Sequence, residues 1–268
     1  MAQGSQTELV AGLRAAIAED RIVPWFQPVM DPAGVDMLSA EALPRWDDPV
    51  RGMVPAGVFI QTAQASGLLP EVSRILLEKA CANFATWRMR GIAPPVVSVN
   101  FTGEELRSPR SVDQLQAAAE RHGIRPGEIA IEIVEECLQE TGWEQNLAGV
   151  ARLREMGVSF ALDDFGTGPG DPGILARVDF ALAKVDRGIV GRLDEDPAMV
   201  ERLRSLVEMA RTKELAIIAK GVETREQIDI LVGLGCNGQQ GFAIARPMPE
   251  DSFAEWLDLN TWPGAAAG

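Results

Sequence analysis

Apolar residues follow two alternating patterns along the chain. Short runs rich in Val, Ile, Leu and Phe predict buried strands, and segments whose apolar residues recur every three or four positions predict helices. The predicted strands span residues 21–30, 35–46, 96–101, 128–135, 158–163, 180–186, 215–220 and 238–244. The predicted helices span residues 5–20, where Ser5 to Glu8 has capping-box spacing, and 70–90, 111–122, 143–156, 197–213 and 224–234.

The order of these elements predicts the fold class. Asp31-Pro32-Ala33-Gly34 separates the first two strands by a short turn, so we expect these two strands to be antiparallel. The later strands are separated by helices, which is typical of parallel strands with crossover connections. We therefore expect an α/β protein with a (β/α)8 TIM-like barrel and an antiparallel first strand. One domain would cover residues 1–268, with an N-terminal helix at 1–20 and a flexible tail at 259–268.

Composition narrows the classes of function. A chain of 268 residues with 46% hydrophobic residues is long enough for one barrel. It contains neither an apolar run of about 18 residues nor a signal peptide, so we expect a cytoplasmic protein with no membrane partner. The net charge of −14 argues against nucleic acid as the main partner. A small phosphorylated ligand stays compatible if a metal or local cations offset that charge.

Cysteine and histidine offer little chemistry. The three cysteines, Cys81, Cys137 and Cys236, have no C-x-x-C spacing, so buried free thiols are expected rather than disulfides or a zinc site. The single histidine, His122, lies at the end of a predicted helix. Catalysis in this protein would have to proceed without imidazole.

Nearly every predicted strand ends on a polar side chain. A barrel with its active site at the carboxyl ends of the strands requires this pattern. Several carboxylates brought together there would repel one another unless a cation held them. The side chains at these ends are Glu41, Asn100, Glu132, Glu135, Asp163, Asp164, Lys184, Asp186, Lys220, Glu223, Gln239 and Gln240.

These side chains suit metal-assisted chemistry on a phosphate ester. The candidate ligands are oxygen donors, which favour Mg²⁺, Mn²⁺ or Ca²⁺ over zinc. Asp163 and Asp164, adjacent on one turn, could serve two ions about 3.5–4 Å apart, and Lys184 could orient a water. The alternatives are a binding module that holds a phosphorylated ligand in the same pocket, and a simple Asp-rich turn after a strand.

Seven motifs in order resemble the EAL-domain family of cyclic di-GMP phosphodiesterases, over the chain from about Val23 to about Trp256. The family fold is a (β/α)8-type barrel with an antiparallel first strand. The motifs are Glu41-Ala42-Leu43-Pro44-Arg45-Trp46, Ser98-Val99-Asn100, Glu132-Ile133-Val134-Glu135, Asp163-Asp164-Phe165-Gly166-Thr167-Gly168, Lys184-Val185-Asp186-Arg187, Gly221-Val222-Glu223-Thr224 and Gln240-Gly241.

The resemblance implies a role for each matching residue. Lys184 would position the attacking water, and Glu135 and Glu223 would brace the site. One Mg²⁺ or Mn²⁺ would be held by Glu41, Asn100, Glu132 and Asp163, and a second ion by Asp163 and Asp164; Ca²⁺ would be an inhibitory alternative. Cyclic di-GMP would contact Gln27, Leu43, Arg45, Asp186, Gln240 and Pro247.

Three departures from the family pattern bear on activity. Lys220 stands where the family has a glutamate that acts as general base, so a carboxylate is lost and a cation is placed near the second metal position. Gly168-Pro169-Gly170-Asp171-Pro172 replaces the family's Gly-Tyr-Ser-Ser-Leu, in a loop that couples dimerisation to the metals. Val134 replaces a threonine beside the metals.

Three functions follow from these matches and departures. The leading hypothesis is a cyclic di-GMP-binding EAL domain with impaired or absent hydrolysis that acts as a signalling receptor or regulatory module. The second is an active Mg²⁺- or Mn²⁺-dependent phosphodiesterase that produces pGpG. The third is a protein-interaction module that binds no nucleotide. The resemblance also implies a homodimer, and a sensor or cyclase-like domain in a longer parent protein.

Overall fold

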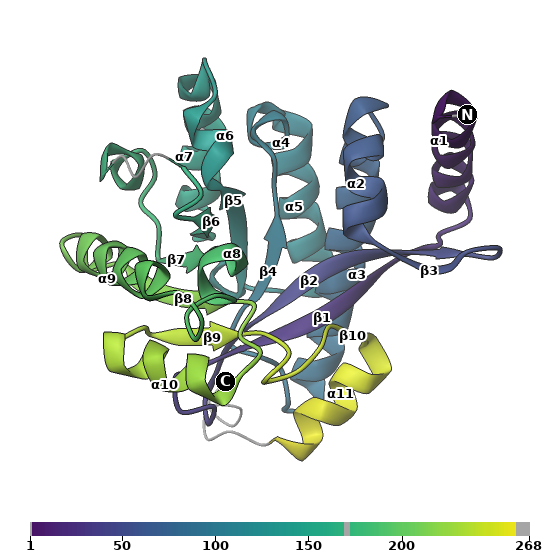
Figure 1. Ribbon diagram of the computed structural model, residues 1–268. Helices are drawn as coiled ribbons and strands as arrows, with labels where there is room; N and C mark the ends of the chain where they lie inside the picture. Colours follow the sequence, from purple (N-terminus) through teal and green to yellow (C-terminus); the bar gives the residue numbers. More distant parts are fainter. Residues whose placement is uncertain (1, 169–171, 261–268) are drawn as a thin grey trace.

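Eight strands close into a barrel in the computed structural model, which describes residues 2–168 and 172–260 (Figure 1). Hydrogen bonds join them in the order β1-β2-β4-β5-β6-β7-β8-β9, and β9 pairs with β1 to close the ring. They are β1 (Ile22–Met30), β2 (Met37–Asp48), β4 (Val97–Asn100), β5 (Ile129–Val134), β6 (Ser159–Phe165), β7 (Leu182–Val185), β8 (Ala216–Lys220) and β9 (Gly238–Gln240). The predicted (β/α)8 barrel is confirmed.

The first strand alone runs against the others in this ring. β1 is antiparallel to both β2 and β9, whereas the remaining neighbours are parallel. β1 and β2 are antiparallel because only a short turn follows Met30. In this turn Asp31 Oδ1 accepts hydrogen bonds from the N–H groups of Val35 and Asp36. Such a turn leaves too little chain for a crossover helix. The antiparallel first strand is therefore confirmed.

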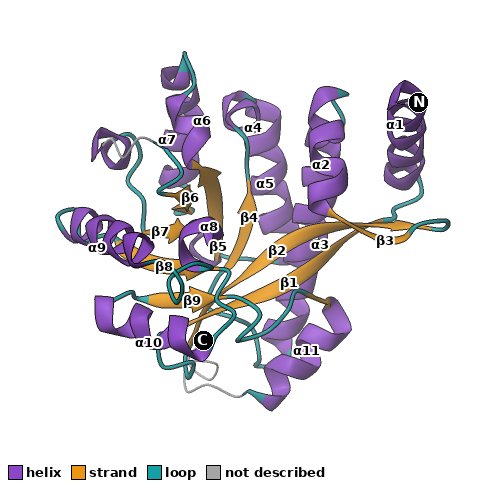
Figure 2. Cartoon of the chain, in the orientation of Figure 1, coloured by secondary structure: helices purple, strands orange, loops and turns teal. Residues whose placement is uncertain are grey.

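Helices pack around the outside of the barrel (Figure 2). Their apolar faces and the outward faces of the strands form one large cluster, here called the barrel core, which includes Phe26, Trp87 and Phe160. Helix ends follow local sequence: in α5 the N-cap is Ser108, and Gly123 closes the helix at φ 62°. The main outer helices are α3 (Leu69–Met89), α5 (Pro109–His122), α7 (Leu147–Glu155), α9 (Pro197–Arg211), α10 (Arg225–Leu234) and α11 (Glu250–Leu259).

Several short elements are absent from the sequence prediction. Helices of four or five residues lack room for a helical repeat of apolar positions, and the short edge strands contain Gly or Pro. These short elements are β3 (Gly52–Pro55), α4 (Gly103–Arg107), η1 (Pro126–Glu128), α6 (Glu135–Gln139), η3 (Pro172–Ala176), α8 (Arg187–Val190) and β10 (Met248–Pro249). Two ten-residue helices, α2 (Ala56–Ala65) and α11, are also absent from the prediction. The helix predicted at 143–156 begins as the 3-10 helix η2 (Trp143–Asn146) and continues as α7.

The two chain ends differ in detail from the prediction. The N-terminal helix α1 spans Ala2–Ala18, so the start predicted at Ser5 is wrong because the helix already runs through that position. At the other end, Leu259 belongs to helix α11 rather than to a tail. The rest of the predicted flexible tail, from residue 261 onward, lies outside the described residues.

The three cysteines are buried free thiols, as predicted. Over residues 2–168 and 172–260, no helix is both long and apolar enough to cross a membrane.

A second apolar cluster lies beside the barrel, where α1, α2 and the β2–β3 hairpin project away from it (Figure 1). We call it the hairpin core. Trp46 is fully buried at its centre, and its ring lies edge-on to Phe59 with centroids 6.1 Å apart. The guanidinium of Arg51 lies 5.8 Å from the Trp46 ring. Trp46, a residue of β2, therefore anchors the hairpin core.

We expect Trp46→Ala to lower the free energy of unfolding by about 3–5 kcal/mol, because it leaves a cavity in a small core. Urea titration followed by circular dichroism measures the change. Val50→Ala on the same hairpin is the matched control, since Val50 is 90% exposed and should change stability by less than about 0.5 kcal/mol. Equal stabilities of the two variants would contradict an anchoring role for Trp46.

Candidate functional site

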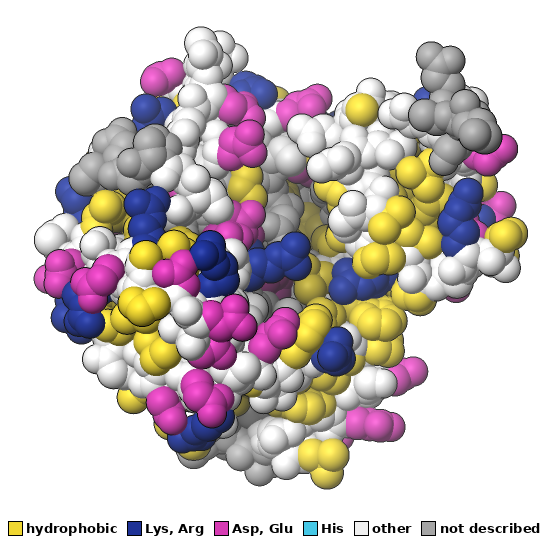
Figure 3. Space-filling view, viewed as in Figure 1, with side chains coloured by type: hydrophobic (Ala, Val, Ile, Leu, Met, Phe, Trp, Pro, Cys, Tyr) yellow, Lys and Arg dark blue, Asp and Glu magenta, His cyan; other side chains and the backbone are white. Residues whose placement is uncertain are grey.

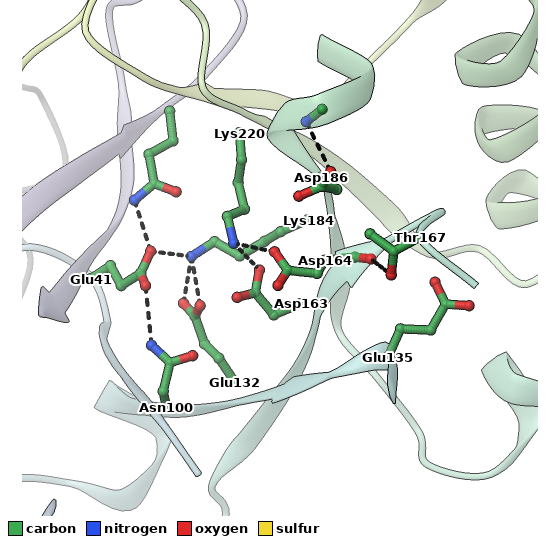
Figure 4. A network of polar contacts seen from close by, with 12 residues as sticks. Glu41, Asn100, Glu132, Glu135, Asp163, Asp164, Thr167, Lys184, Asp186 and Lys220 are labelled. Atoms are coloured by element: carbon green, nitrogen blue, oxygen red, sulfur yellow. Dashed lines mark hydrogen bonds and ion pairs between the residues drawn. The ribbon is translucent and has the colours of Figure 1, made fainter. Parts of the chain in front are cut away.

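Polar side chains from seven strands converge at the carboxyl end of the parallel strands (Figure 4). Pairing of Asn100 with Glu132, and of Lys220 with Gln240, places these strand ends at one level. The structure thus brings together most of the residues that the sequence selects. The converging side chains are Glu41 on β2, Asn100 on β4, Glu132 on β5, Asp163 and Asp164 on β6, Lys184 on β7, Lys220 on β8 and Gln240 on β9.

Lys184 lies between two buried glutamates. Its Nζ donates to Glu41 Oε2 at 2.6 Å and to the two oxygens of Glu132 at 2.6 and 2.7 Å. The Lys184 side chain is 2% exposed. Asn100 Nδ2 and Gln240 Nε2 donate to Glu41 at 3.1 and 2.9 Å. One ammonium and two amides therefore hold these carboxylates in place.

Lys220 makes a second ion-pair group beside the first. Its Nζ donates to Asp163 Oδ1 at 2.6 Å and to Asp164 Oδ1 at 2.8 Å. Asp164 adopts φ 51°, a left-handed backbone that turns its carboxylate to the same side as that of Asp163. Two neighbouring aspartates of one strand can share a partner only because the strand is ending there.

Burial and charge act in opposite directions on the carboxyl groups. Burial alone would raise the pKa of Glu41, but the charges of Lys184 and Lys220 lower that pKa to about 2. Burial and the nearby charge of Glu41 raise the pKa of Glu132 to about 7, despite Lys184. Burial also raises the pKa of Asp163. Glu41 holds its charge more strongly than Glu132 because it receives the amide hydrogen bond from Gln240 and is near both ammonium groups.

The two lysines stay protonated. Burial would lower the pKa of Lys184 and of Lys220, but the surrounding carboxylates raise both pKa values well above the usual range. Two ammonium groups thus face four carboxylates, so negative charge is in excess at the bottom of the site. This excess suits a bound cation or the protonation of Glu132.

The turn after the aspartates is held from two sides. Glu135 is 1% exposed, and its Oε2 accepts a hydrogen bond of 2.7 Å from the Gly166 N–H. Arg202 of α9 donates to the carbonyl oxygens of Gly166 and Gly168 at 2.9 and 3.1 Å. The sequence predicts a role for Glu135 but not for Arg202, because nothing in the helical segment of Arg202 distinguishes it from other surface arginines.

The remaining candidates lie around this centre. Gln27 Nε2 donates to the carbonyl oxygen of Ala245 at 2.9 Å, and Asp186 caps α8 by accepting from the Gly188 N–H at 2.8 Å. Leu43 and Pro247 are half-buried. Glu223 is exposed, with its backbone N–H bound to Gln227 Oε1 at 2.8 Å.

Arg45 lies near the ring of Trp25, with its guanidinium carbon 5.3 Å from the ring centroid. Burial lowers the pKa of Arg45, and the charge of Glu41 opposes that change. The Arg45 side chain also donates to the carbonyl oxygen of Pro44 at 2.9 Å. The position of the Arg45 guanidinium is therefore set by the hydrogen bond to Pro44 on its own strand and by the contact with Trp25.

The oxygen donors fit a hard divalent cation only in part. Glu41, Asn100, Glu132 and Asp163 supply the ligand type that Mg²⁺ or Mn²⁺ prefers, although Lys184 bonds two of them. At Asp163 and Asp164 the donors do not fit a second ion, because Lys220 already bonds both carboxylates. Within the described parts of the chain, no group of three or more His, Cys, Asp or Glu side chains is arranged to hold a metal.

Residues 11–247 match the family model described as the EAL domain. The chain belongs to the EAL domain family. The resemblance predicted from the seven motifs is thereby confirmed, and the barrel is an EAL barrel.

Characterised EAL proteins are among the relatives of the chain. The bifunctional diguanylate cyclase/cyclic di-GMP phosphodiesterase MucR of Pseudomonas aeruginosa is 33% identical over 249 residues, which are 92% of this chain and 36% of that protein. The cyclic di-GMP phosphodiesterase PdeR of Escherichia coli is 32% identical, over 92% of this chain and 37% of that protein. The chain thus spans little more than a third of the length of these relatives.

Solved EAL structures have the same architecture. A MucR phosphodiesterase structure in complex with c-di-GMP superposes with a TM-score of 0.87 at 32% identity, covering 92% of this chain and 99% of that chain. The EAL domain of Xanthomonas citri FimX superposes with a TM-score of 0.82 at 20% identity, over 92% of this chain and 96% of that chain, which supports the fold alone.

Removal of the buried ammonium is expected to destabilise this EAL domain. We expect Lys184→Met to lower the free energy of unfolding by about 3–5 kcal/mol in EDTA, because two buried carboxylates lose their partner. Lys213→Met, at an exposed lysine, is the control and should change stability by less than about 0.5 kcal/mol. Urea titration measures both, and a Lys184→Met variant as stable as wild type would show that the ion pair is dispensable.

The held turn allows a second test. A Cβ at Gly168 would lie 2.2 Å from Glu135 Oε1, so we expect Gly168→Ala to lower the free energy of unfolding by about 1–3 kcal/mol. The control Gly57→Ala lies in α2, where no atom is within 4 Å of the added Cβ, and should leave stability unchanged or raise it by up to about 1 kcal/mol. Thermal unfolding of both variants decides the point, and a neutral Gly168→Ala would contradict tight packing of this turn.

Proposed function

We propose that this EAL domain binds cyclic di-GMP and hydrolyses it slowly or not at all, acting as a receptor or regulatory module. The observation that carries the proposal is the position of Lys220, whose Nζ bonds Asp163 at 2.6 Å and Asp164 at 2.8 Å. The sequence resemblance assigns these carboxylates to a second metal ion. Lys220 offsets part of their negative charge with a charge that belongs to the chain itself.

Lys220 acts against hydrolysis in two ways. Its ammonium repels a divalent cation that approaches the two aspartates. It also replaces the carboxylate that the resemblance assigns as general base, so no group at this position accepts a proton from the attacking water. The two-ion arrangement that stabilises both the attacking and the leaving oxygen of a phosphodiester is therefore lost.

The proposal of nucleotide binding rests on the residues that match the ligand-binding positions of the family. Arg45, whose guanidinium lies beside the Trp25 ring, offers a planar group for a phosphate. Gln27, Leu43, Asp186, Gln240 and Pro247 complete the proposed ligand contacts. A Mg²⁺ or Mn²⁺ held by Glu41, Asn100, Glu132 and Asp163 would supply further positive charge to that phosphate, with Ca²⁺ as an inhibitory substitute. The c-di-GMP complex of the related MucR phosphodiesterase supports this choice of ligand.

An active phosphodiesterase that produces pGpG is the second candidate. Relatives at 33% and 32% identity bear the name of cyclic di-GMP phosphodiesterase, and the proposed ligands of the first ion are all present together with Lys184. Glu223, exposed on the loop after β8, would then take the role of base. The third candidate, a protein-interaction module without nucleotide, does not account for the presence of Arg45, Asn100, Glu132 and both aspartates at the positions that match the family motifs.

The proposal also includes further domains, an oligomeric state and a cellular location for this EAL domain. Because the chain spans little more than a third of MucR and PdeR, a sensor or cyclase-like domain in a longer parent protein is proposed and not observed. A homodimer through the loop after the aspartates and a cytoplasmic location are likewise predictions. Residues 169–171 of that loop lie outside the described residues.

Lys220→Glu is expected to restore hydrolysis. With Mg²⁺ or Mn²⁺ present, the variant should produce pGpG at least about a hundredfold faster than wild type, because it regains a base and frees the aspartates for a second ion. Chromatography of the products measures the rate. Lys213→Glu carries the same charge change at an exposed site and should stay as slow as wild type. Fast turnover by the wild type would instead establish the second candidate.

Cyclic di-GMP is expected to stabilise the wild type, since a ligand that binds only the folded state adds about 2.7 kcal/mol at a hundred times its Kd. The rise in melting temperature should persist in EDTA, because Lys220 offsets part of the charge of the two aspartates without an ion. Differential scanning calorimetry with and without nucleotide gives the answer. Absence of any shift at saturating nucleotide, with or without metal, would leave only the protein-interaction module.

A further inference from the structure

An outer helix of the barrel takes part in holding the chain around Asp164. Residues 164–168, here called the Asp164 turn, lead from the end of β6 out of the barrel. Arg202 of α9 donates from one nitrogen, Nη2, to the carbonyl oxygens of Gly166 and Gly168 at 2.9 and 3.1 Å. A single side chain, more than 30 positions away in the sequence, therefore bonds two carbonyl groups of this turn.

The backbone of the Asp164 turn depends on contacts from outside it. Asp164 has φ 51°, a conformation that residues other than glycine rarely adopt. Its carbonyl oxygen accepts from the N–H and the Oγ1 of Thr167 at 3.3 and 2.9 Å. A Cβ at Gly166 would lie 2.6 Å from Leu206 Cδ1 and 2.8 Å from Ile189 Cδ1. The turn is thus packed directly against α9 and α8, and these helices support its unusual backbone.

Arg202 lies on the side of α9 that meets the turn. It is half-buried and precedes Leu206 by four residues, so these two side chains share one face of the helix. Arg204, by contrast, is exposed and pairs with Glu201 at 3.4 Å. In the view that Figures 1 and 3 share, α9 lies to the left of a central hollow that charged side chains of both signs surround. Arg202 therefore reaches the turn from an outer helix.

The two aspartates depend on this turn to different degrees. Asp163 is paired with Val134 in the sheet, and its side chain is 6% exposed. The side chain of Asp164 is 41% exposed, and Figure 4 shows it between Lys220 and Thr167. Lys220 Nζ bonds Asp163 at 2.6 Å and Asp164 at 2.8 Å. A change in the turn would therefore displace the Asp164 carboxylate and leave that of Asp163 in place.

We propose that Arg202 is a positioning residue of the candidate site. By bonding two carbonyl oxygens of the Asp164 turn, it keeps the Asp164 carboxylate beside that of Asp163. In the wild type this pair of carboxylates shares Lys220, and in the Lys220→Glu variant the pair is free for an ion. The effect of Arg202 on turnover rests on the proposed function, whereas its effect on the bond between Asp164 and Lys220 does not.

A double-mutant cycle in EDTA tests the coupling of Arg202 to Lys220 without nucleotide. Arg202→Met and Lys220→Met should each lower the folding equilibrium constant, measured by urea titration. The constant of the double variant should exceed the product of the two single effects by about threefold or more, because Arg202→Met already loosens Asp164 from Lys220. Direct repulsion between the two cations would give the opposite sign. Arg204→Met combined with Lys220→Met is the control, and its effects should multiply within about twofold.

Turnover and ion binding by the Lys220→Glu variant test the consequence for the site. Adding Arg202→Met should lower kcat for cyclic di-GMP about tenfold or more and change KM less than about threefold, because Asp164 is displaced and the proposed nucleotide contacts are not. Electron paramagnetic resonance of added Mn²⁺ should show one ion bound more weakly. Arg202→Lys keeps a charged donor and should give an intermediate kcat, and Arg204→Met should leave kcat unchanged.

Each outcome decides either the role of Arg202 or the proposed function. Purely multiplicative effects of Arg202→Met and Lys220→Met, or an unchanged kcat after Arg202→Met, would overturn the positioning role. If Arg202→Met does not fold, Arg202→Gln, which is polar but has a shorter reach, takes its place in both tests. If neither wild type nor Lys220→Glu binds cyclic di-GMP, the proposed function is wrong, and the cycle still decides the role of Arg202.

Discussion

The candidate site depends on the burial of two ammonium groups among acidic side chains. Glu41, Glu132 and Asp163 are each at most 4% exposed, and carboxylates so close together cannot all stay charged without cations. Lys184 and Lys220 supply those cations from β7 and β8. The strand register, the amides of Asn100 and Gln240, and the turn after Asp164 all serve to keep these charges within bonding distance.

This arrangement separates two tasks that a metal centre would combine. The carboxylates are held together by ammonium and amide groups of the chain itself. Activation of water needs a base and freely available carboxylates, and Lys220 limits both. Under the proposed function, a domain with this balance would recognise a phosphodiester and cleave it slowly or not at all.

The sequence predicts much of this fold because strands buried on both faces leave continuous apolar runs. It also predicts which polar residues meet, since the carboxyl ends of parallel strands lie at one end of a barrel. It does not predict that Lys184 bonds Glu41 and Glu132, because these contacts join residues 143 and 52 positions apart through side chains whose reach depends on the register. The sequence does not predict the role of Arg202 for a similar reason, because that role depends on its neighbours in space, the carbonyl oxygens of Gly166 and Gly168.

The closure of the barrel has a consequence for how the protein is made. β1 is completed by β9 and β10, and Gln27 reaches Ala245 across 218 positions. A ribosome that adds about 5–20 residues per second takes roughly 10–45 s to cover that distance. During this time β1 lacks the hydrogen-bond partners that β9 and β10 provide, and the candidate site lacks the side that β9 forms. The nascent chain is therefore unable to complete the candidate site until almost all of the domain has emerged.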